Sequence, residues 1–91
     1  MMKKEKETKQ FVTYILECAD GTLYVGSTDN LERRLHEHNN LKSGAHYTKI
    51  RRPVALKYRE TFTNIKDARA RERVLKRLTR KKKVELIKKT K

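Results

Sequence analysis

Residues 11–26 read FVTYILECADGTLYVG and decide the fold of this 91-residue chain. The runs 11–18 and 23–26 are rich in aromatic and β-branched side chains, and an Asp-Gly pair at positions 20 and 21 lies between them. Such a pair between two β-rich runs is typical of a tight turn. The stretch therefore predicts an antiparallel β-hairpin.

The rest of the chain predicts one more strand and three helices. An Asp29-x-x-Glu32 capping box marks the start of the first helix. The expected elements after the hairpin are a helix from 29 to 38 or 39, a loop over 43–53 with room for one helical turn, a strand over 54–61, a helix from 63 or 64 to about 78, and a helix from 79 to 88. The expected fold class is α+β, a small three-stranded antiparallel sheet flanked by helices in the order β-β-α-β-α-α. Residues 1–10 are expected to be a disordered polar tail and residues 11–91 a single domain.

Composition limits what this chain can be. A membrane span needs about 18 to 20 consecutive apolar residues, and the sequence has no such run. The single cysteine, Cys18, cannot form an internal disulfide, and the three histidines lack zinc-site spacing. We therefore expect a soluble protein of the reducing cytoplasm, with no membrane partner.

Positive charge is concentrated at one end. The whole chain has a formal net charge of +14, and residues 66–91 alone hold 13 Lys and Arg against 3 Asp and Glu. A cluster of this kind attracts polyanions and gains affinity by releasing their counterions. Nucleic acid is therefore the expected partner and an anionic lipid surface the second. A lysine-rich face that only keeps the protein in solution is the alternative.

Polar residues interrupt the apolar stripes of two predicted helices. At helical spacing the inward positions are Leu31, Arg34, Leu35 and His38 in the first helix and Ile65, Ala68, Glu72 and Leu75 in the second. Arg34 and His38 are four residues apart, so a single anionic ligand would reach both. A partly buried Glu72 needs a basic partner or a metal ion. A plain salt bridge between Arg34 and Glu72 is the structural alternative.

Two tyrosines add hydroxyl groups to the hairpin. Tyr14 lies in its first strand, and Tyr24 lies two residues before Gly26 in its second strand. Tyrosines in strands usually pack in a core. Gly26, however, allows the backbone to approach a ligand closely where the chain leaves the strand.

These motifs, taken in order, resemble the GIY-YIG nuclease superfamily, and more narrowly its small stand-alone branch. The resemblance runs over about residues 11–90 and rests on Thr13-Tyr14, Tyr24-Val25-Gly26, Leu31-Glu-Arg-Arg-Leu35, His38-Asn39 and Arg71-Glu72. Val12 and Thr13 replace the glycine and isoleucine of the first motif, a change that is common in this branch.

The resemblance implies a role for each catalytic candidate. It implies that Tyr14 and Tyr24 flank the scissile phosphate, with one of them helping to deprotonate the attacking water. It implies that Arg34 holds the phosphate and that Glu72 is the only protein ligand of one divalent cation, Mg²⁺ or Mn²⁺. His38 would assist proton transfer or orient Tyr14.

Further residues are expected to contact nucleic acid. Tyr47 is a candidate for stacking on a base, and the basic residues around it and in the last two helices are candidates for binding backbone phosphates. The set comprises Gly26, Tyr47, Lys49, Arg51, Arg52, Arg69, Arg73, Lys76, Arg80 and Lys81.

The resemblance thus implies a metal-dependent endonuclease that selects for substrate structure or weakly for sequence and serves DNA repair. DNA is favoured over RNA as the substrate, and the sequence leaves both open. A protein partner would supply further specificity. Two alternatives remain open: a non-catalytic nucleic-acid-binding module that retains the fold, and a basic ribosome-associated factor.

Overall fold

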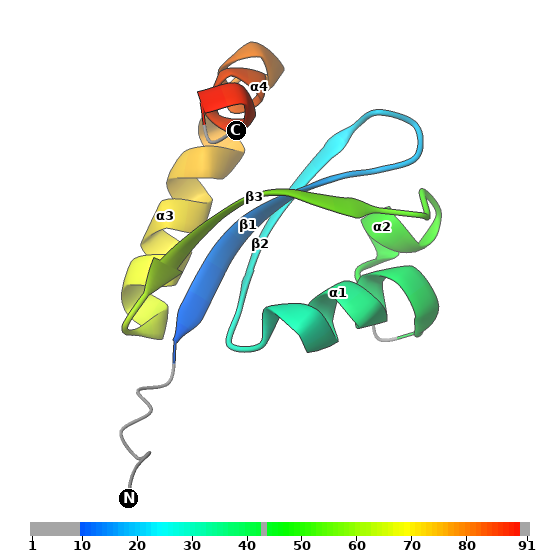
Figure 1. Cartoon of the computed structure of the whole chain (residues 1–91), viewed down its shortest axis with the longest axis horizontal. Helices are drawn as coiled ribbons and strands as arrows, with labels where there is room; N and C mark the ends of the chain where they lie inside the picture. The colour runs from blue at the N-terminus through cyan, green and yellow to red at the C-terminus, as the bar shows by residue number, and fades with distance from the viewer. Residues whose placement is uncertain (1–9, 43, 90–91) are drawn as a thin grey trace, which may run out of the picture.

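The computed structural model describes residues 10–42 and 44–89 of the chain (Figure 1). The elements run in the order β1 (Phe11–Glu17), β2 (Leu23–Thr28), α1 (Leu31–Asn40), α2 (His46–Lys49), β3 (Ala55–Phe62), α3 (Ile65–Arg77) and α4 (Arg80–Lys89). The strands form one antiparallel sheet in the order β2-β1-β3. The expected α+β fold class, strand count and element order are confirmed. α2 is a single helical turn inside the loop expected over residues 43–53. Of the expected tail, all but Gln10 falls outside the described residues.

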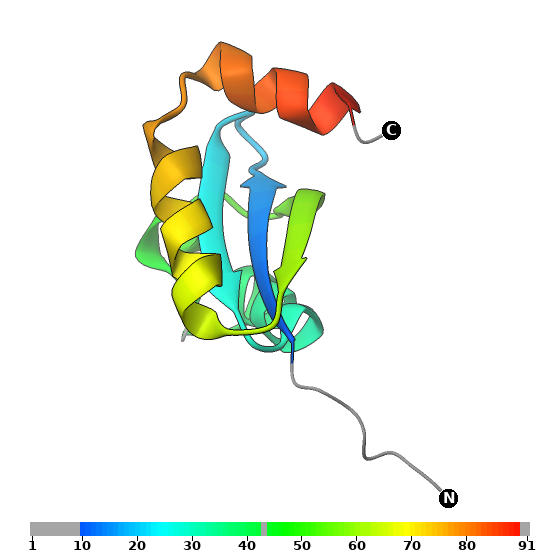
Figure 2. The same ribbon diagram turned by 90° about the vertical axis from the view of Figure 1, so that its left-hand side faces the viewer.

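Helices cover the two faces of the sheet separately. Figure 1 shows α3 on one side of the strands and α1 with α2 on the other, and Figure 2 shows α4 running across one end of the sheet. Alternate side chains of β1 supply the two cores. Tyr14 and Leu16 pack with the half-buried Leu31 and Leu35 of α1, whereas Ile15 packs in a second cluster toward α3 and α4. The central strand therefore has two buried faces.

The start of α1 differs from the expected capping box. Asn30 is the N-cap, and its side chain accepts a hydrogen bond from the backbone N–H of Arg33 at 3.0 Å. Asp29 instead pairs with the Arg33 guanidinium at 3.1 Å. A capping box needs its first residue directly before the helix, and the helix begins at Leu31, one residue too late for Asp29 and Glu32 to form it. The capping-box prediction is wrong, although the helix itself is present.

Caps at the two C-terminal helices follow the sequence. Asn64 accepts a hydrogen bond from the backbone N–H of Asp67 at 2.8 Å and is the N-cap of α3. Thr79 accepts one from the backbone N–H of Lys82 at 3.2 Å. Each cap satisfies an N–H group that the first helical turn leaves without a partner.

Two hydroxyl groups hold α3 against the sheet. Thr13 of β1 donates to the carbonyl oxygen of Ala68 at 2.7 Å, and Ser27 of β2 donates to the Glu72 carboxylate at 2.5 Å. Thr13 and Ser27 are opposite each other in the β1–β2 ladder, and their partners are one helical turn apart. The departure from the superfamily motif at position 13 therefore has a structural use.

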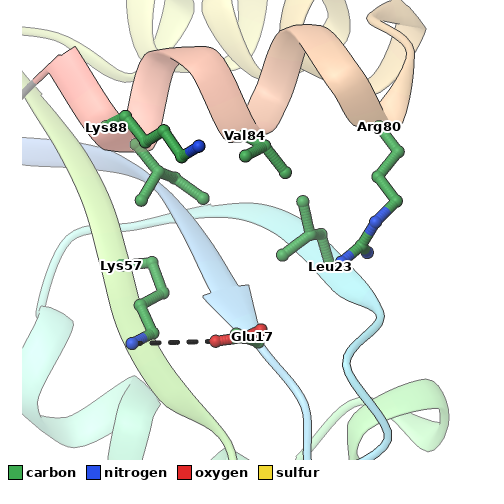
Figure 3. A pocket seen from close by; sticks show the side chains of 7 residues that line it. Glu17, Leu23, Lys57, Arg80, Val84 and Lys88 are labelled. Carbon is green, nitrogen blue, oxygen red and sulfur yellow. Dashed lines mark ion pairs between the residues drawn. The ribbon is translucent and has the colours of Figure 1, made fainter.

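A groove of about 450 Å³ separates α4 from the ends of the strands (Figure 3). Its apolar lining comes from Leu23, Val84 and Ile87, and its rim carries an ion pair of 3.6 Å between Lys57 and Glu17. None of the predicted catalytic residues lines it. No described residue of α4 is fully buried, so this helix is the least enclosed of the long ones.

The Thr13 hydrogen bond leads to a stability prediction. Thr13→Val keeps the side-chain shape but removes the donor to Ala68, so we expect the free energy of unfolding to fall by about 1 kcal/mol, or about 4–8 °C in Tm. Urea and thermal unfolding followed by circular dichroism would measure it. Thr61→Val, at an exposed position of β3, is the control, and an equal loss in both variants would contradict the prediction.

Candidate active site

Tyr14 is built into the sheet by its cross-strand partner Gly26. The two residues face each other in the β1–β2 register, and Tyr14 is only 2% exposed. A Cβ atom on residue 26 would lie 2.5 Å from the Tyr14 hydroxyl oxygen and 2.7 Å from its ring carbon Cζ. Gly26 is therefore required here because the Tyr14 phenol lies across its Cα, and this close contact gives the glycine a role other than binding nucleic acid.

The Tyr14 hydroxyl belongs to a buried hydrogen-bond chain. Its oxygen lies 3.0 Å from Nε2 of His38, and Nδ1 of His38 lies 2.7 Å from Oγ1 of Thr48. Thr48 donates its only hydroxyl proton to the carbonyl oxygen of Ala45 at 2.9 Å, because a carbonyl can only accept. Thr48 must then accept from His38 Nδ1–H. In the neutral imidazole, Nε2 is therefore the acceptor, and Tyr14 donates its proton to it.

Burial decides the ionisation of both groups. Desolvation and the neighbouring Arg34 charge lower the pKa of His38 to about 4, which keeps the imidazole neutral at pH 7. Desolvation also raises the pKa of Tyr14 to about 12, although a hydrogen bond from Arg34 opposes it. His38 is fully buried, so the expected single anionic ligand for Arg34 and His38 cannot reach His38. That expectation is wrong, because α1 turns this histidine into the core.

Arg34 is the charged neighbour of the buried phenol, and its interaction with Tyr14 lowers the pKa of the phenol. It pairs with Glu37 at 2.8 Å, and its side chain is 26% exposed. The ion pair with Glu37, one turn along α1, takes the place of the simple Arg34–Glu72 salt bridge that was the structural alternative. A partly exposed guanidinium over a phenol is suited to bind a phosphate oxygen.

Tyr24 is held by an aromatic stack. Its ring stacks on Tyr47 with centroids 5.9 Å apart, and it meets the His38 ring edge-on at 5.3 Å. The Arg51 guanidinium lies 3.8 Å from the Tyr47 ring centroid and pairs with Asp20 at 3.1 Å. Tyr47 and Arg51 are thus engaged in supporting Tyr24, which leaves Tyr47 little free ring surface for a nucleic-acid base.

Glu72 is a half-buried, ionised carboxylate. Ser27 donates to its Oε1, and the Lys76 ammonium lies 2.9 Å from its Oε2. Burial raises the pKa of Glu72, but hydrogen bonds from Lys76 and Ser27 outweigh burial and hold this pKa below its ordinary value. Its side chain is 19% exposed, so Glu72 does not point into bulk solvent.

The candidate residues lie on both sides of the sheet. Tyr14, Tyr24, Arg34 and His38 lie on the α1 side of the sheet, whereas Glu72 comes from α3 on the other side (Figure 2). The Glu72 charge contributes to the raised Tyr14 pKa, and Tyr24 contributes to the raised Lys76 pKa, so the groups on the two sides lie within electrostatic reach of each other. Glu72 is linked through Ser27 to a hollow of about 370 Å³, which is lined by Phe11, Ser27, Thr28, Asp29, Ile65 and Arg69.

The donor set around Glu72 suits a magnesium or manganese ion. Carboxylate and hydroxyl oxygens are hard ligands that such ions prefer. Among residues 10–42 and 44–89, no group of three or more His, Cys, Asp or Glu side chains converges. Glu72 would therefore be the principal protein ligand, with water and phosphate oxygens completing the shell, as Mg²⁺ commonly requires.

Two of the other predicted contact residues are used inside the fold. Arg52 donates to the carbonyl oxygens of Glu37, His38 and Leu41 at the end of α1. Arg80 donates to the carbonyl oxygen of Gly21 at 2.7 Å and ties α4 to the hairpin turn. Four other basic residues of this set are exposed on α3 and α4: Arg69, Arg73, Lys76 and Lys81. Lys49 is half-buried and is the last residue of α2.

Neither the role of Ser27 nor the contact of Thr48 with His38 was predicted from the sequence. Ser27 follows Gly26 in β2, so alternation places it on the face that α3 covers; a polar residue on that covered face was the available signal. Thr48 lies in a four-residue helix with no apolar period. Its link to His38 depends on how α2 folds back on α1, which no local pattern indicates.

The GIY-YIG catalytic domain matches residues 10–85 of this sequence. The chain belongs to the GIY-YIG family. Its relatives are UPF0213 proteins, a small stand-alone branch of this nuclease superfamily. A UPF0213 protein of Desulfotalea psychrophila is 44% identical over 97% of this chain and 80% of its own length, and one of Syntrophus aciditrophicus is 49% identical over 89% and 92%.

Solved structures share the fold. The solution NMR structure of an E. faecalis protein has a TM-score of 0.62 at 42% identity, covering 90% of this chain and 86% of that one. The solution NMR structure of the Bacillus halodurans UPF0213 protein has a TM-score of 0.56 at 37% identity, covering 87% of this chain and 83% of that one.

Within the part of the chain that the structure describes, no helix has the length and apolar character that a membrane span requires.

The buried neutral His38 predicts a loss of stability in mild acid. Its pKa of about 4 in the folded protein lies below the value of about 6.5 in an unfolded chain, so the unfolded state binds the proton first as pH falls. Stability is complete above about pH 6.5, and we expect the free energy of unfolding to fall by about 2 kcal/mol between pH 7 and pH 5. Urea titrations at half-unit pH intervals would measure it.

The matched control for this pH dependence is His36→Gln. His36 is exposed on the same helix, so its replacement should leave the slope unchanged. A flat stability profile between pH 7 and pH 5 would contradict a buried neutral His38.

Gly26→Ala should push the Tyr14 hydroxyl away from His38. The added Cβ would lie 2.5 Å from the Tyr14 hydroxyl oxygen, and we expect about 1–3 kcal/mol of lost stability with a changed ¹⁵N shift at His38 Nε2. In a Tyr14→Phe background the same substitution should cost less, because the hydroxyl in closest contact is gone. Equal costs in both backgrounds would show that the contact with Tyr14 is not responsible.

Proposed function

We propose that this protein is a metal-dependent endonuclease that hydrolyses phosphodiester bonds in DNA. The observation that carries the proposal is the hydrogen-bond chain from Thr48 through His38 to Tyr14, next to a partly exposed Arg34 and within electrostatic reach of Glu72. Membership of a nuclease family supports hydrolysis of nucleic acid. A core that only needed to pack would have no use for this arrangement.

The chain of hydrogen bonds assigns the proton path. The Tyr14 hydroxyl donates to His38, which leaves its oxygen lone pairs available to accept from the Arg34 guanidinium nearby and from the attacking water. As the water loses a proton to Tyr14, Tyr14 passes its own proton to Nε2 of His38. The high Tyr14 pKa disfavours a free phenolate, so both transfers belong to one step. That step leaves His38 as an imidazolium, and its low pKa makes it a strong acid that returns the proton through Tyr14 to solvent after cleavage. This path favours Tyr14, rather than Tyr24, as the proton acceptor.

The remaining residues stabilise charge. Arg34 binds a non-bridging oxygen of the scissile phosphate, and the Tyr24 hydroxyl, held by its stack on Tyr47, positions the same phosphate. Glu72 holds the divalent cation, which when bound neutralises negative charge on the phosphate and the leaving oxygen. Because Tyr14 is buried, the substrate reaches it only after side chains around it move.

Substrate choice in this proposal follows shape more than sequence. The exposed basic residues Arg69, Arg73 and Lys81 lie along α3 and α4 and are suited to backbone phosphates, which carry no base identity. Flaps, branches, nicks and single strands are therefore the proposed substrates, and DNA repair is a process that presents them. A protein partner would add specificity.

A non-catalytic nucleic-acid-binding module is the second candidate. It is favoured by the Lys76 ammonium on Glu72 and by the 2% exposure of Tyr14. The basic surface would act identically in both cases, so only cleavage separates them.

The nuclease proposal predicts that binding and cleavage separate on mutation. With Mg²⁺ or Mn²⁺, wild-type protein should cut at least one of branched, nicked, single-stranded or duplex DNA. Tyr14→Phe should lower kcat by about 10²- to 10⁴-fold, and Glu72→Gln should abolish cleavage, while DNA affinity measured by fluorescence anisotropy stays within about twofold in both variants. Gel assays of labelled substrates would measure the rates.

Glu32→Gln is the control for this assay, because Glu32 is an exposed carboxylate in the first turn of α1. Its rate should equal the wild-type rate. Cleavage that survives Glu72→Gln would mean a contaminating nuclease or a different site. Binding without cleavage of any substrate would establish the binding module instead.

A further inference from the structure

One cationic side chain already binds the carboxylate to which the divalent ion is assigned. Lys76 Nζ lies 2.9 Å from Oε2 of Glu72, and the Lys76 side chain is 54% exposed whereas Glu72 is 19% exposed. The contact is a hydrogen-bonded ion pair, and Glu72 is the main cause of the raised Lys76 pKa. The position of a cation on Glu72 is therefore taken by the protein itself.

The two oxygens of Glu72 are not equivalent. Oε1 accepts a hydrogen bond from Ser27, which belongs to the edge strand of the sheet. Oε2 pairs with the ammonium group of Lys76, whose side chain is 54% exposed. An incoming ion can displace a flexible lysine far more readily than a strand hydroxyl, so Oε2 is the oxygen open to exchange.

We propose that Lys76 is a placeholder cation: it holds Glu72 in position while the site lacks a metal, and it moves to a substrate phosphate when a divalent ion takes Oε2. The inference rests on the proposed function. Like charges repel, so the ion drives the ammonium off the carboxylate. Lys76 stays on the same helix face as Arg69 and Arg73, where a bound backbone phosphate would receive it.

This exchange has two energetic consequences. Displacing Lys76 weakens metal binding, because the ion must break an existing pair. The displaced ammonium then gains a phosphate partner, so metal and nucleic acid strengthen each other's binding, and the two effects are equal by linkage. Ser27 keeps Glu72 in place during the exchange.

The test measures Mn²⁺ binding in the absence of DNA, by isothermal titration and by electron paramagnetic resonance of the free ion. Lys76→Met removes the ammonium but keeps the apolar stem. We expect it to tighten Mn²⁺ binding by about two- to fivefold, the range expected for a partly exposed ion pair. Glu72→Gln should weaken binding at least tenfold. Lys66→Met, which removes the same charge from an exposed position of α3, is the matched control and should come within about 1.5-fold of wild type.

A second measurement follows the lysine to the phosphate. Fluorescence anisotropy of a labelled DNA duplex, with and without Mn²⁺, should show that Lys76→Met loses more affinity when Mn²⁺ is present than when it is absent. Lys66→Met should lose the same amount under both conditions. Equal losses for Lys76→Met would remove the second half of the proposal.

The outcomes distinguish this inference from the proposed function. Mn²⁺ affinity that is unchanged or weaker in Lys76→Met, or absent from all four proteins, overturns the placeholder role. Tighter Mn²⁺ binding in Lys76→Met without cleavage by wild type keeps the placeholder role and rejects the nuclease. Glu72-dependent cleavage by wild type, with no change in Mn²⁺ affinity in Lys76→Met, supports the nuclease and rejects the placeholder role.

Discussion

The candidate site depends on the register between β1 and β2, which sets Thr13 opposite Ser27 and Tyr14 opposite Gly26. Successive residues of a strand point to opposite faces. One pair therefore supplies hydroxyls to α3, while the next lays a phenol across a glycine toward His38. A slip of one residue would exchange the faces and dismantle both halves together. The same backbone pairing thus determines the attachment of α3 and the position of Tyr14.

The order of the sheet makes it possible for residues from both faces to act on one substrate, as the proposed function requires. β2 is an edge strand with β1 as its one neighbour in the described sheet. α1 supplies Arg34 on one side of that edge, and α3 supplies Glu72 on the other. A sugar-phosphate backbone lying along the edge would contact both, whereas a site in the middle of the sheet would be divided by the central strand. Arg71 pairs with Glu60 of β3 at 2.9 Å, which fixes the rotation of α3 so that Glu72 faces β2.

The relation between polar residues and apolar stripes was the most informative part of the sequence, and also where its limits appear. It identified Arg34, His38 and Glu72 as residues that an ordinary packed helix does not need. It did not show that His38 is sealed from solvent, that Tyr47 and Arg51 support Tyr24, or that Arg52 caps α1. Periodicity shows which face of a helix turns inward, but not how far a side chain lies from the surface or which loop folds over it.

The sequence by itself determined the hairpin, the α+β element order, the caps of α3 and α4 and the basic C-terminal third, because these depend on turn chemistry, alternation and charge within a few residues of one another. Only the tertiary structure decided the partners of the site residues. Tyr14 meets His38 across 24 positions and Ser27 meets Glu72 across 45. Such contacts depend on strand register, helix rotation and loop closure acting together, and no local pattern encodes all three.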